Sequence, residues 1–187
     1  MSVMQVFGEN GEAVSETLSD HNKISAQLKA IGIRLEHWST PQKFETGAEH
    51  EAILAAYQDY IDQLNTEYGF EFVDVSALWP EHPKKSELRA QFASEHRHSD
   101  DEVRFFVDGA GLFYFHIDDK VYLVLCEQGD LISVPARTRH WFDMGKNPDF
   151  TLIRFFPTRD GWVAESSGDD IATKIPDMDS FVSSLNH

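Results

Sequence analysis

From residue 102 onward the chain is a succession of short apolar runs separated by turn-forming residues, and this pattern constrains the fold more than any other feature. The runs are rich in Phe, Val and Ile, and the breaks between them carry Gly, Asp, Asn or Pro. Several short strands at such spacing are typical of an antiparallel β-barrel or jelly roll. The expected strands cover residues 102–107, 111–117, 121–126, 131–134, 140–142 and 150–156.

The first half of the chain has a mixed pattern that adds helices to this β core. Apolar residues recur there at intervals of three and four, and Gly32 and Gly69 follow two such segments as helix stops. Residues 33–38 alternate like a short strand. We expect the helices to pack on the outside of the barrel, so the predicted fold class is mainly β with added α. The expected helices cover residues 25–31, 48–68 and 85–93.

No linker, internal repeat or low-complexity segment divides the 187 residues, so we expect a single domain. Within it, residues 1–93 form the mixed helical and strand part, and residues 94–160 form the barrel core. Residues 161–187 form a polar C-terminal tail that is expected to be partly irregular.

The composition disfavours several classes of partner and of cellular location. The 32 acidic residues outnumber the 16 basic ones and give a net charge of −16, which disfavours nucleic acids and anionic membrane surfaces. No apolar run reaches the roughly 18 residues of a membrane span. The single cysteine, Cys126, and the absence of a signal-peptide pattern favour a cytosolic protein. A surplus of carboxylates usually forms a solvated surface, so residue spacing must identify any metal site.

The first candidate metal ligands are His96, His98 and Glu102. Two histidines at positions i and i+2 of an extended chain point to the same face. Their imidazoles could chelate a divalent metal, and Glu102 could add a carboxylate. A solvated polar loop before a strand is the alternative interpretation.

The fourth candidate ligand is His140, which is expected to open the strand after Pro135. An isolated histidine on an apolar strand is more often structural. Here three expected strands separate it from Glu102, so an antiparallel meander could return it to the first pair of histidines. Three imidazoles and one carboxylate would leave about two positions open on an octahedral metal.

These residues resemble the two motifs of the cupin superfamily. The first motif has the form His-x-His, three or four residues, Glu, six residues, Gly, and the second has the form Gly, five residues, Pro, four residues, His. The matching residues are His96, His98, Glu102 and Gly109, followed by Gly129, Pro135 and His140. Three residues depart from the motifs, which often have Gly, Gly and Asn at the positions of Ala90, Arg137 and Met144. These departures bear on the cupin subfamily more than on the metal site, because all four ligand positions are intact.

Longer strings are similar to those of the acireductone dioxygenases, a cupin family. They are residues 94–105, SEHRHSDDEVRF, and residues 129–135, GDLISVP, with residues 140–145, HWFDMG. The resemblance covers most of the chain and is densest between residues 80 and 157.

The resemblance implies an Fe(II) or Ni(II) ion, one per chain, held by the four candidate ligands. It implies dioxygen and the acireductone 1,2-dihydroxy-3-keto-5-methylthiopentene of methionine salvage as substrates. In this family the Fe(II) form gives 2-keto-4-methylthiobutyrate and formate, and the Ni(II) form gives methylthiopropionate, formate and carbon monoxide. A monomer is expected from the resemblance.

Two arginines are candidates for binding an anionic substrate. Arg104 shares the parity of Glu102 and should face the interior, and the family assigns the matching arginine to the substrate dianion, so we predict that Arg104 is catalytic. Arg154 lies in an otherwise apolar strand, where a charge is costly unless it is paired or faces a cavity. It is a second candidate anion contact, with an outward charge or a buried ion pair as alternatives.

Three aromatic residues, Phe92, Phe142 and Trp162, could line an apolar pocket for the thioether end of the substrate, although core packing would also explain them. Glu95 and Asp101 flank the ligands, and the family gives matching acids auxiliary roles; surface charge is the alternative. The remaining six of the nine histidines lack motif context and receive no role: His21, His37, His50, His82, His116 and His187.

The leading hypothesis is therefore a metal-dependent dioxygenase. The cupin motifs would also fit a different cupin, such as an isomerase or another small-molecule dioxygenase, but the longer strings disfavour it. A non-enzymatic cupin that senses a metal or small ligand is the third possibility, which the lack of a visible DNA-binding module weakens.

Overall fold

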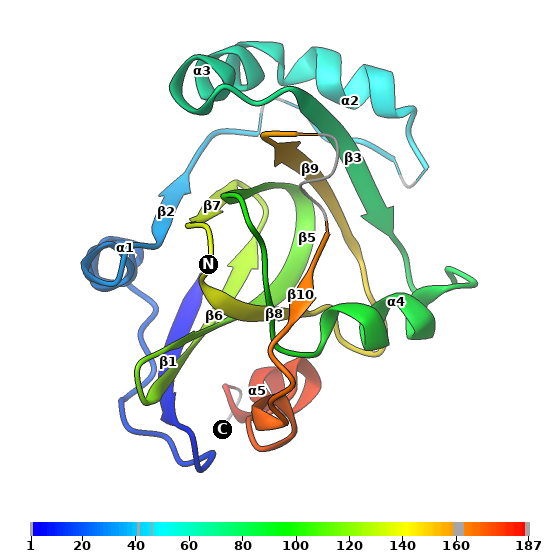
Figure 1. Cartoon of the computed structure of the whole chain (residues 1–187). Helices are drawn as coiled ribbons and strands as arrows, with labels where there is room; N and C mark the ends of the chain where they lie inside the picture. The colour runs from blue at the N-terminus through cyan, green and yellow to red at the C-terminus, as the bar shows by residue number, and fades with distance from the viewer. Residues whose placement is uncertain (1, 41, 46, 159–162, 186–187) are drawn as a thin grey trace.

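Strand β5 (Glu102–Ile117) runs through two antiparallel sheets and joins them (Figure 1). Its first half pairs with β7 (Asp130–Val134) and β9 (Phe150–Phe156). Its second half pairs with β6 (Lys120–Glu127) and β8 (Arg139–Asp143). The structure is a computed structural model and describes residues 2–40, 42–45, 47–158 and 163–185.

Further strands extend each sheet outward. The first sheet has the order β2-β7-β5-β9-β3, in which β2 is Arg34–His37 and β3 is Phe72–Leu78. The second has the order β1-β6-β5-β8-β4-β10, in which β1 is Val3–Gly8, β4 is His96–Arg97 and β10 is Glu165–Ser166. The two sheets together form a barrel that the described strands leave open. This two-sheet antiparallel arrangement confirms the predicted jelly-roll class.

The sequence predicted two strands where the structure has the single strand β5. The strand bends instead of ending, because its pairing with β9 shifts register between Phe106 and Asp108. Gly109 has a φ of 74°, and a Cβ there would lie 1.9 Å from the carbonyl oxygen of Asp149. The bend inverts the alternation of side chains, so Glu102 in the first half and Phe113 in the second both line the same interior cavity.

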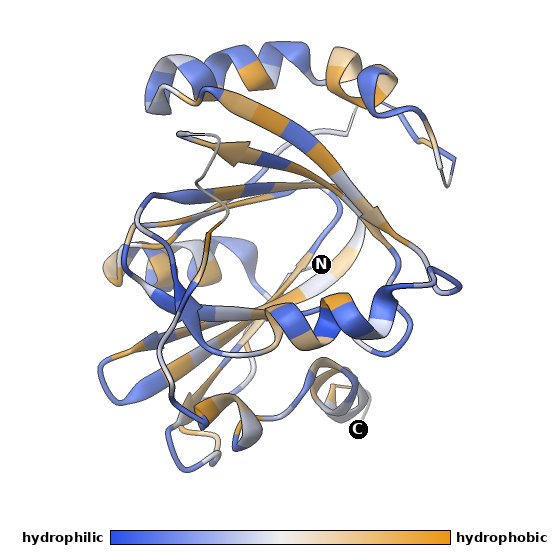
Figure 2. Ribbon diagram, turned by 45° about the vertical axis from the view of Figure 1, so that its right-hand side comes forward, coloured by the Kyte–Doolittle hydropathy of each residue, from blue (hydrophilic) through white to orange (hydrophobic). Residues whose placement is uncertain are grey.

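The helices flank the two sheets, and Figure 2 shows both hydropathy colours on them; the helix Lys85–Phe92 contributes Phe92 to the lining of the interior cavity instead of covering an outer face. The helix expected over residues 48–68 is wrong as a single element. It is divided at Tyr57, whose φ of −108° and ψ of 15° depart from a helix and whose buried ring packs 5.2 Å from that of Phe105. The α-helices are α1 (His21–Ala30), α2 (His50–Ala56), α3 (Gln58–Tyr68), α4 (Lys85–Phe92) and α5 (Met178–Ser184), with a short 3-10 helix at Ile171–Thr173. None of the described helices is long and apolar enough to cross a membrane.

The described part of the C-terminal tail, residues 163–185, contains α5 and packs against the β core. Phe181 of α5 is 1 % exposed and belongs to the same apolar cluster as Tyr114 of β5 and Trp141 of β8. The rings of Tyr114 and Trp141 stack with their centroids 4.8 Å apart. The tail therefore packs on the outer face of the second sheet, and its burial contributes to the core.

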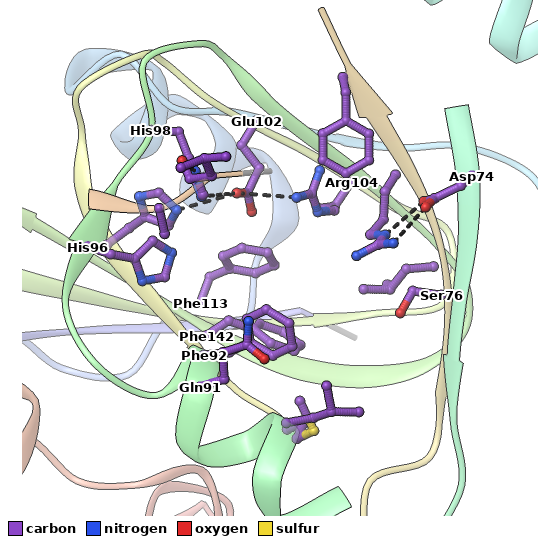
Figure 3. A pocket seen from close by; sticks show the side chains of 18 of the residues that line it. Asp74, Ser76, Gln91, Phe92, His96, His98, Glu102, Arg104, Phe113 and Phe142 are labelled. Carbon is purple, nitrogen blue, oxygen red and sulfur yellow. Dashed lines mark hydrogen bonds and ion pairs between the residues drawn. The ribbon is translucent and has the colours of Figure 1, made fainter. Parts of the chain in front are cut away.

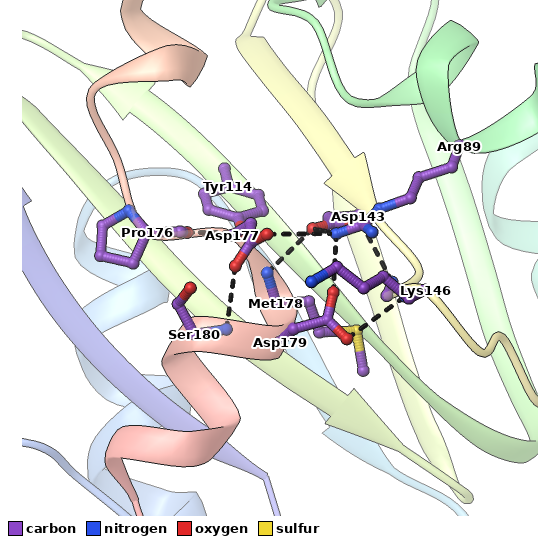
Figure 4. A network of polar contacts seen from close by, with 10 residues as sticks. Arg89, Tyr114, Asp143, Lys146, Pro176, Asp177, Met178, Asp179 and Ser180 are labelled. Carbon is purple, nitrogen blue, oxygen red and sulfur yellow. Dashed lines mark hydrogen bonds and ion pairs between the residues drawn. The ribbon is translucent and has the colours of Figure 1, made fainter. Parts of the chain in front are cut away.

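A polar network anchors α5 to β8 and α4 (Figure 4). The Nε and Nη2 atoms of Arg89 donate to the two carboxylate oxygens of Asp143 at 2.6 and 2.8 Å, and Nη2 also donates to Asp179 at 2.9 Å. Asp143, which is 3 % exposed, accepts further hydrogen bonds from the main-chain N–H groups of Gly145 and Met178 at 3.0 and 2.8 Å. This carboxylate thus joins three elements of the structure.

Candidate metal centre

Three buried histidines converge on one point at the inner side of the second sheet, and Figure 3 labels two of them, His96 and His98. His96 of β4 lies opposite His140 of β8 in the strand register, and His98 follows two residues after His96. One ring nitrogen from each of the three lies within 4.8 Å of the others, a spacing that could hold a metal ion. The antiparallel meander thus returns the fourth predicted ligand to the first two.

Main-chain carbonyls fix the tautomer of each of these histidines. A carbonyl oxygen only accepts hydrogen bonds, so the Nδ1 atom facing it carries the proton and Nε2 keeps a free lone pair. Every ring therefore offers Nε2 as a potential ligand atom. The acceptors are the carbonyls of Ser94 for His96 at 2.8 Å, Val163 for His98 at 3.0 Å and Thr138 for His140 at 2.7 Å.

The carboxylate of Glu102 completes the cluster. Its Oε2 lies 2.9 Å from Nε2 of His98 and 3.5 Å from Nε2 of His140. In the tautomers described above, these contacts bring lone pairs together, which is unfavourable unless a cation or a proton lies between them. The Nε2 of His140 is also buried without a hydrogen-bond partner among the described residues. The donor set of three imidazoles and one carboxylate therefore fits a divalent transition metal.

The electrostatics of the cluster favour a neutral His96 and an ionised Glu102. Burial lowers the pKa of His96 to about 4. Burial also acts to lower the pKa of His98, but the hydrogen bond and the charge of Glu102 raise it above its ordinary value. For Glu102, burial acts upward, whereas the charge of Arg104 and the close contacts of its Oε2 with His140 and His98 hold its pKa well below the usual range.

Arg104 lies in β5 beside the carboxylate and is 9 % exposed. Its Nη2 is 3.3 Å from Oε2 of Glu102, its Nη1 donates to the carbonyl of Val103 at 2.9 Å, and its guanidinium lies 4.9 Å from the centre of the Phe156 ring. The shared parity with Glu102 therefore places Arg104 in the same interior, as the sequence predicted.

The cluster opens onto a cavity of about 990 Å³ between the two sheets. Arg104 lines the polar part, and Phe92 of α4 and Phe142 of β8 line the apolar part, as Figure 3 shows. Such a volume is within the range of small-molecule sites. The third predicted aromatic residue, Trp162, lies outside the described residues.

Arg154 also lines the cavity, but its charge is already compensated. Its Nε and Nη2 donate to the two carboxylate oxygens of Asp74 at 2.8 and 2.6 Å. Sequence analysis missed Asp74 because no strand was predicted around it. The alternation of Asp74 and Ser76 with Val73, Val75 and Ala77 is the signal that could have revealed β3 and its polar inner face.

The two auxiliary acids lie beside the cluster without lining the cavity. Glu95 is buried, and its Oε2 contacts Nδ1 of His116 at 2.5 Å, while Nε2 of His116 lies 2.9 Å from Oε1 of Glu9. Asp101 accepts a hydrogen bond from the main-chain N–H of Ala136 at 2.8 Å. His116 was set aside in the sequence for lack of a motif, yet it holds the residue next to His96 from the opposite side of the sheet.

The fold and this donor set define a cupin with a candidate site for one metal ion. The sequence model of the ARD/ARD' family matches residues 3–164, and the chain therefore belongs to that family.

Curated relatives are similar over nearly their whole length. The acireductone dioxygenase of Methylococcus capsulatus is 48% identical over 182 residues, covering 97% of this chain and 98% of the relative. The acireductone dioxygenase of Aquifex aeolicus is also 48% identical, with 97% and 99% covered. Among solved structures, the acireductone dioxygenase of Bacillus anthracis with a cadmium ion in its active centre is 31% identical with a TM-score of 0.77, covering 88% of this chain and 98% of that one.

Proposed function

We propose that the protein is an acireductone dioxygenase of methionine salvage that acts on 1,2-dihydroxy-3-keto-5-methylthiopentene and dioxygen. The observation that carries the proposal is the convergence of three Nε2 lone pairs and one carboxylate oxygen at the polar end of an otherwise apolar cavity. Membership of the ARD/ARD' family gives that arrangement its reaction.

In this proposal His96, His98, Glu102 and His140 hold one Fe(II) or Ni(II) ion per chain. The bound ion would supply a Lewis acid that polarises two adjacent oxygens of the substrate. The main-chain carbonyls hold the Nδ1 proton of each ring, so all three imidazoles turn Nε2 toward the cluster, and the ion would take the place of any proton that His98 holds beside Glu102. The ionised state of Glu102 adds the negative charge that favours a divalent cation.

Arg104 is the proposed catalytic residue. Its buried guanidinium lies beside the metal cluster and carries a fixed positive charge, so it would stabilise the deprotonated enediol of the substrate. The substrate tail would pack against Phe92 and Phe142, and against Trp162, whose role rests on the sequence only. Arg154 is a proposed second contact through Nη1, the guanidinium nitrogen that the Asp74 carboxylate does not engage.

The two flanking acids have proposed auxiliary roles that follow from their contacts. Glu95 would fix the backbone next to His96 through its contact with His116. Asp101 would fix the segment that leads to His140 through its hydrogen bond to Ala136. The proposal further takes the protein to be cytosolic, as the sequence predicts, and monomeric, because one chain supplies the whole described cavity lining.

The test uses the whole protein, stripped of metal and reloaded with Fe(II) or Ni(II). The acireductone is added under air, and the loss of the enediol absorbance is followed together with oxygen uptake and product identification. We expect metal-dependent consumption, with 2-keto-4-methylthiobutyrate and formate from the Fe(II) form and methylthiopropionate, formate and carbon monoxide from the Ni(II) form. Stoichiometric metal binding without turnover would contradict the proposal and favour a non-enzymatic cupin or one with another substrate.

A further inference from the structure

The ring of Phe142 lies directly over Gly111 in the wall of the cavity. Gly111 belongs to the second half of β5, two residues before Phe113, and Phe113 pairs with Phe142 in the strand register. A Cβ built on Gly111 would lie 2.3 Å from Cζ and 2.4 Å from Cε2 of Phe142. Non-bonded carbon atoms favour separations of about 3.5–4.0 Å, so no side chain fits beneath this ring.

Space, and not backbone conformation, requires glycine at this position. Gly111 lacks the positive φ that Gly109 has, so an L-residue could adopt its backbone conformation without strain. The atoms that a Cβ would meet most closely belong to the far end of one side chain, and not to a neighbouring backbone. A larger residue at position 111 would therefore displace the Phe142 ring.

The cavity is the direction in which that ring can move. Its other sides are held by Phe113, at 4.9 Å between ring centres, and by Phe150, at 5.8 Å in an edge-to-face contact. Cε1 of Phe106 would lie 3.6 Å from the added Cβ and closes a further side. Phe142 is only half-buried and lines the cavity, so its exposed part faces the space where a ligand would lie.

We propose that Gly111 is a specificity-determining residue: its missing side chain lets Phe142 lie back against the sheet and leaves room for the substrate tail at the apolar end of the cavity. Gly111 acts through Phe142 and is a positioning residue. The inference rests on the proposed function, which places the methylthioethyl tail of the acireductone at that end. The enediol end would lie among the polar groups, away from the displaced ring.

The test compares the metal-loaded wild type with Gly111→Ala on two acireductones. One carries the methylthioethyl tail, and the other carries a methyl group in its place. We expect the ratio of kcat/KM for the long substrate to that for the short one to fall about tenfold, mainly through KM, as for a misfit of one methylene group in an apolar pocket. Gly8→Ala, in β1 and away from the cavity, is the matched control, because the closest atom to its added Cβ would be Oδ1 at the end of the Asn10 side chain, at 2.9 Å, and Cγ1 of Val14 would lie at an ordinary contact distance of 3.7 Å.

The same substitution in a Phe142→Leu background separates a steric effect from general damage. Leucine lacks the ring atoms Cζ and Cε2 that the added Cβ would meet, so Gly111→Ala should change the specificity ratio by less than about twofold in this background. An equal fall in both backgrounds, or no fall in the wild-type background, overturns the inference. If Gly111→Ala does not fold, the double variant must fold with the specificity ratio of Phe142→Leu; its failure to fold would also overturn the inference. A metal-loaded wild type that consumes neither substrate refutes the proposed function instead.

Discussion

Replacing Asp143 by Ala is expected to lower the free energy of unfolding by about 3–5 kcal/mol, the usual cost of removing one partner from a buried ion pair. The structure supports this magnitude, because the 3 % exposed carboxylate accepts two hydrogen bonds from Arg89 and one each from Gly145 and Met178. Each buried donor that loses its acceptor costs about 1–3 kcal/mol. Asp179 still compensates part of the Arg89 charge at 2.9 Å, which keeps the expected loss below the sum of these terms.

Urea unfolding of the metal-free protein, with a chelator present in every sample, measures this loss without a contribution from metal binding. The melting temperature should fall by roughly 6–20 °C at 2–4 °C per kcal/mol. The matched control is Arg97→Met, which breaks the exposed ion pair with Glu165 and should cost less than about 1 kcal/mol. Equal losses in the two variants, or strictly additive losses for Asp143→Ala and Arg89→Met, would refute the reasoning.

Three further predictions concern the candidate metal centre. His140→Ala should remove bound metal and activity together, as metal analysis beside the oxygen-uptake assay will reveal; a fully active variant would contradict the ligand assignment. Arg104→Met should keep its metal but lower kcat by about 10²–10³-fold, the range for losing one charge-stabilising donor, and an unchanged kcat would exclude its catalytic role. Burial lowers the pKa of His96 to about 4 from 6.5, so the unfolded chain binds more protons between these values. The metal-free protein should therefore lose up to roughly 3 kcal/mol as the pH falls from 6.5 to 4, and His96→Gln should abolish that loss in pH-dependent urea unfolding.

The candidate site could be predicted from the sequence to the extent that its residues lie in short local motifs. His96, His98 and Glu102 lie within seven residues, and the spacing from Pro135 to His140 identified the fourth member. Strand alternation also placed Arg104 correctly. The contacts that complete the site come from distant segments, such as the Val163 carbonyl that fixes His98 and the Asp74 carboxylate that pairs with Arg154 across 80 positions. No local pattern encodes these pairings.

The fold shows the same division between local and distant information. The strand pattern predicted the jelly roll, because alternation and turn residues are local properties. The helix prediction for residues 48–68 failed at Tyr57, where packing of a buried ring against Phe105 overrides the helical periodicity on both sides. The strand pattern failed to distinguish a bend from a turn at Asp108–Gly109, since glycine is compatible with both and only the pairing with β9 decides between them.

The main-chain carbonyls behind the three histidines have a consequence for how this protein can diverge. Because Ser94, Thr138 and Val163 contribute backbone oxygens, replacing their side chains leaves those acceptors in the chain. Random mutation could therefore vary the apolar lining, and with it substrate preference, while the presentation of the imidazoles is retained. The backbone thus orients the ligating imidazoles, whereas side chains of the cavity lining set substrate preference. This separation makes the scaffold a suitable starting point for directed evolution toward acireductones with other tails.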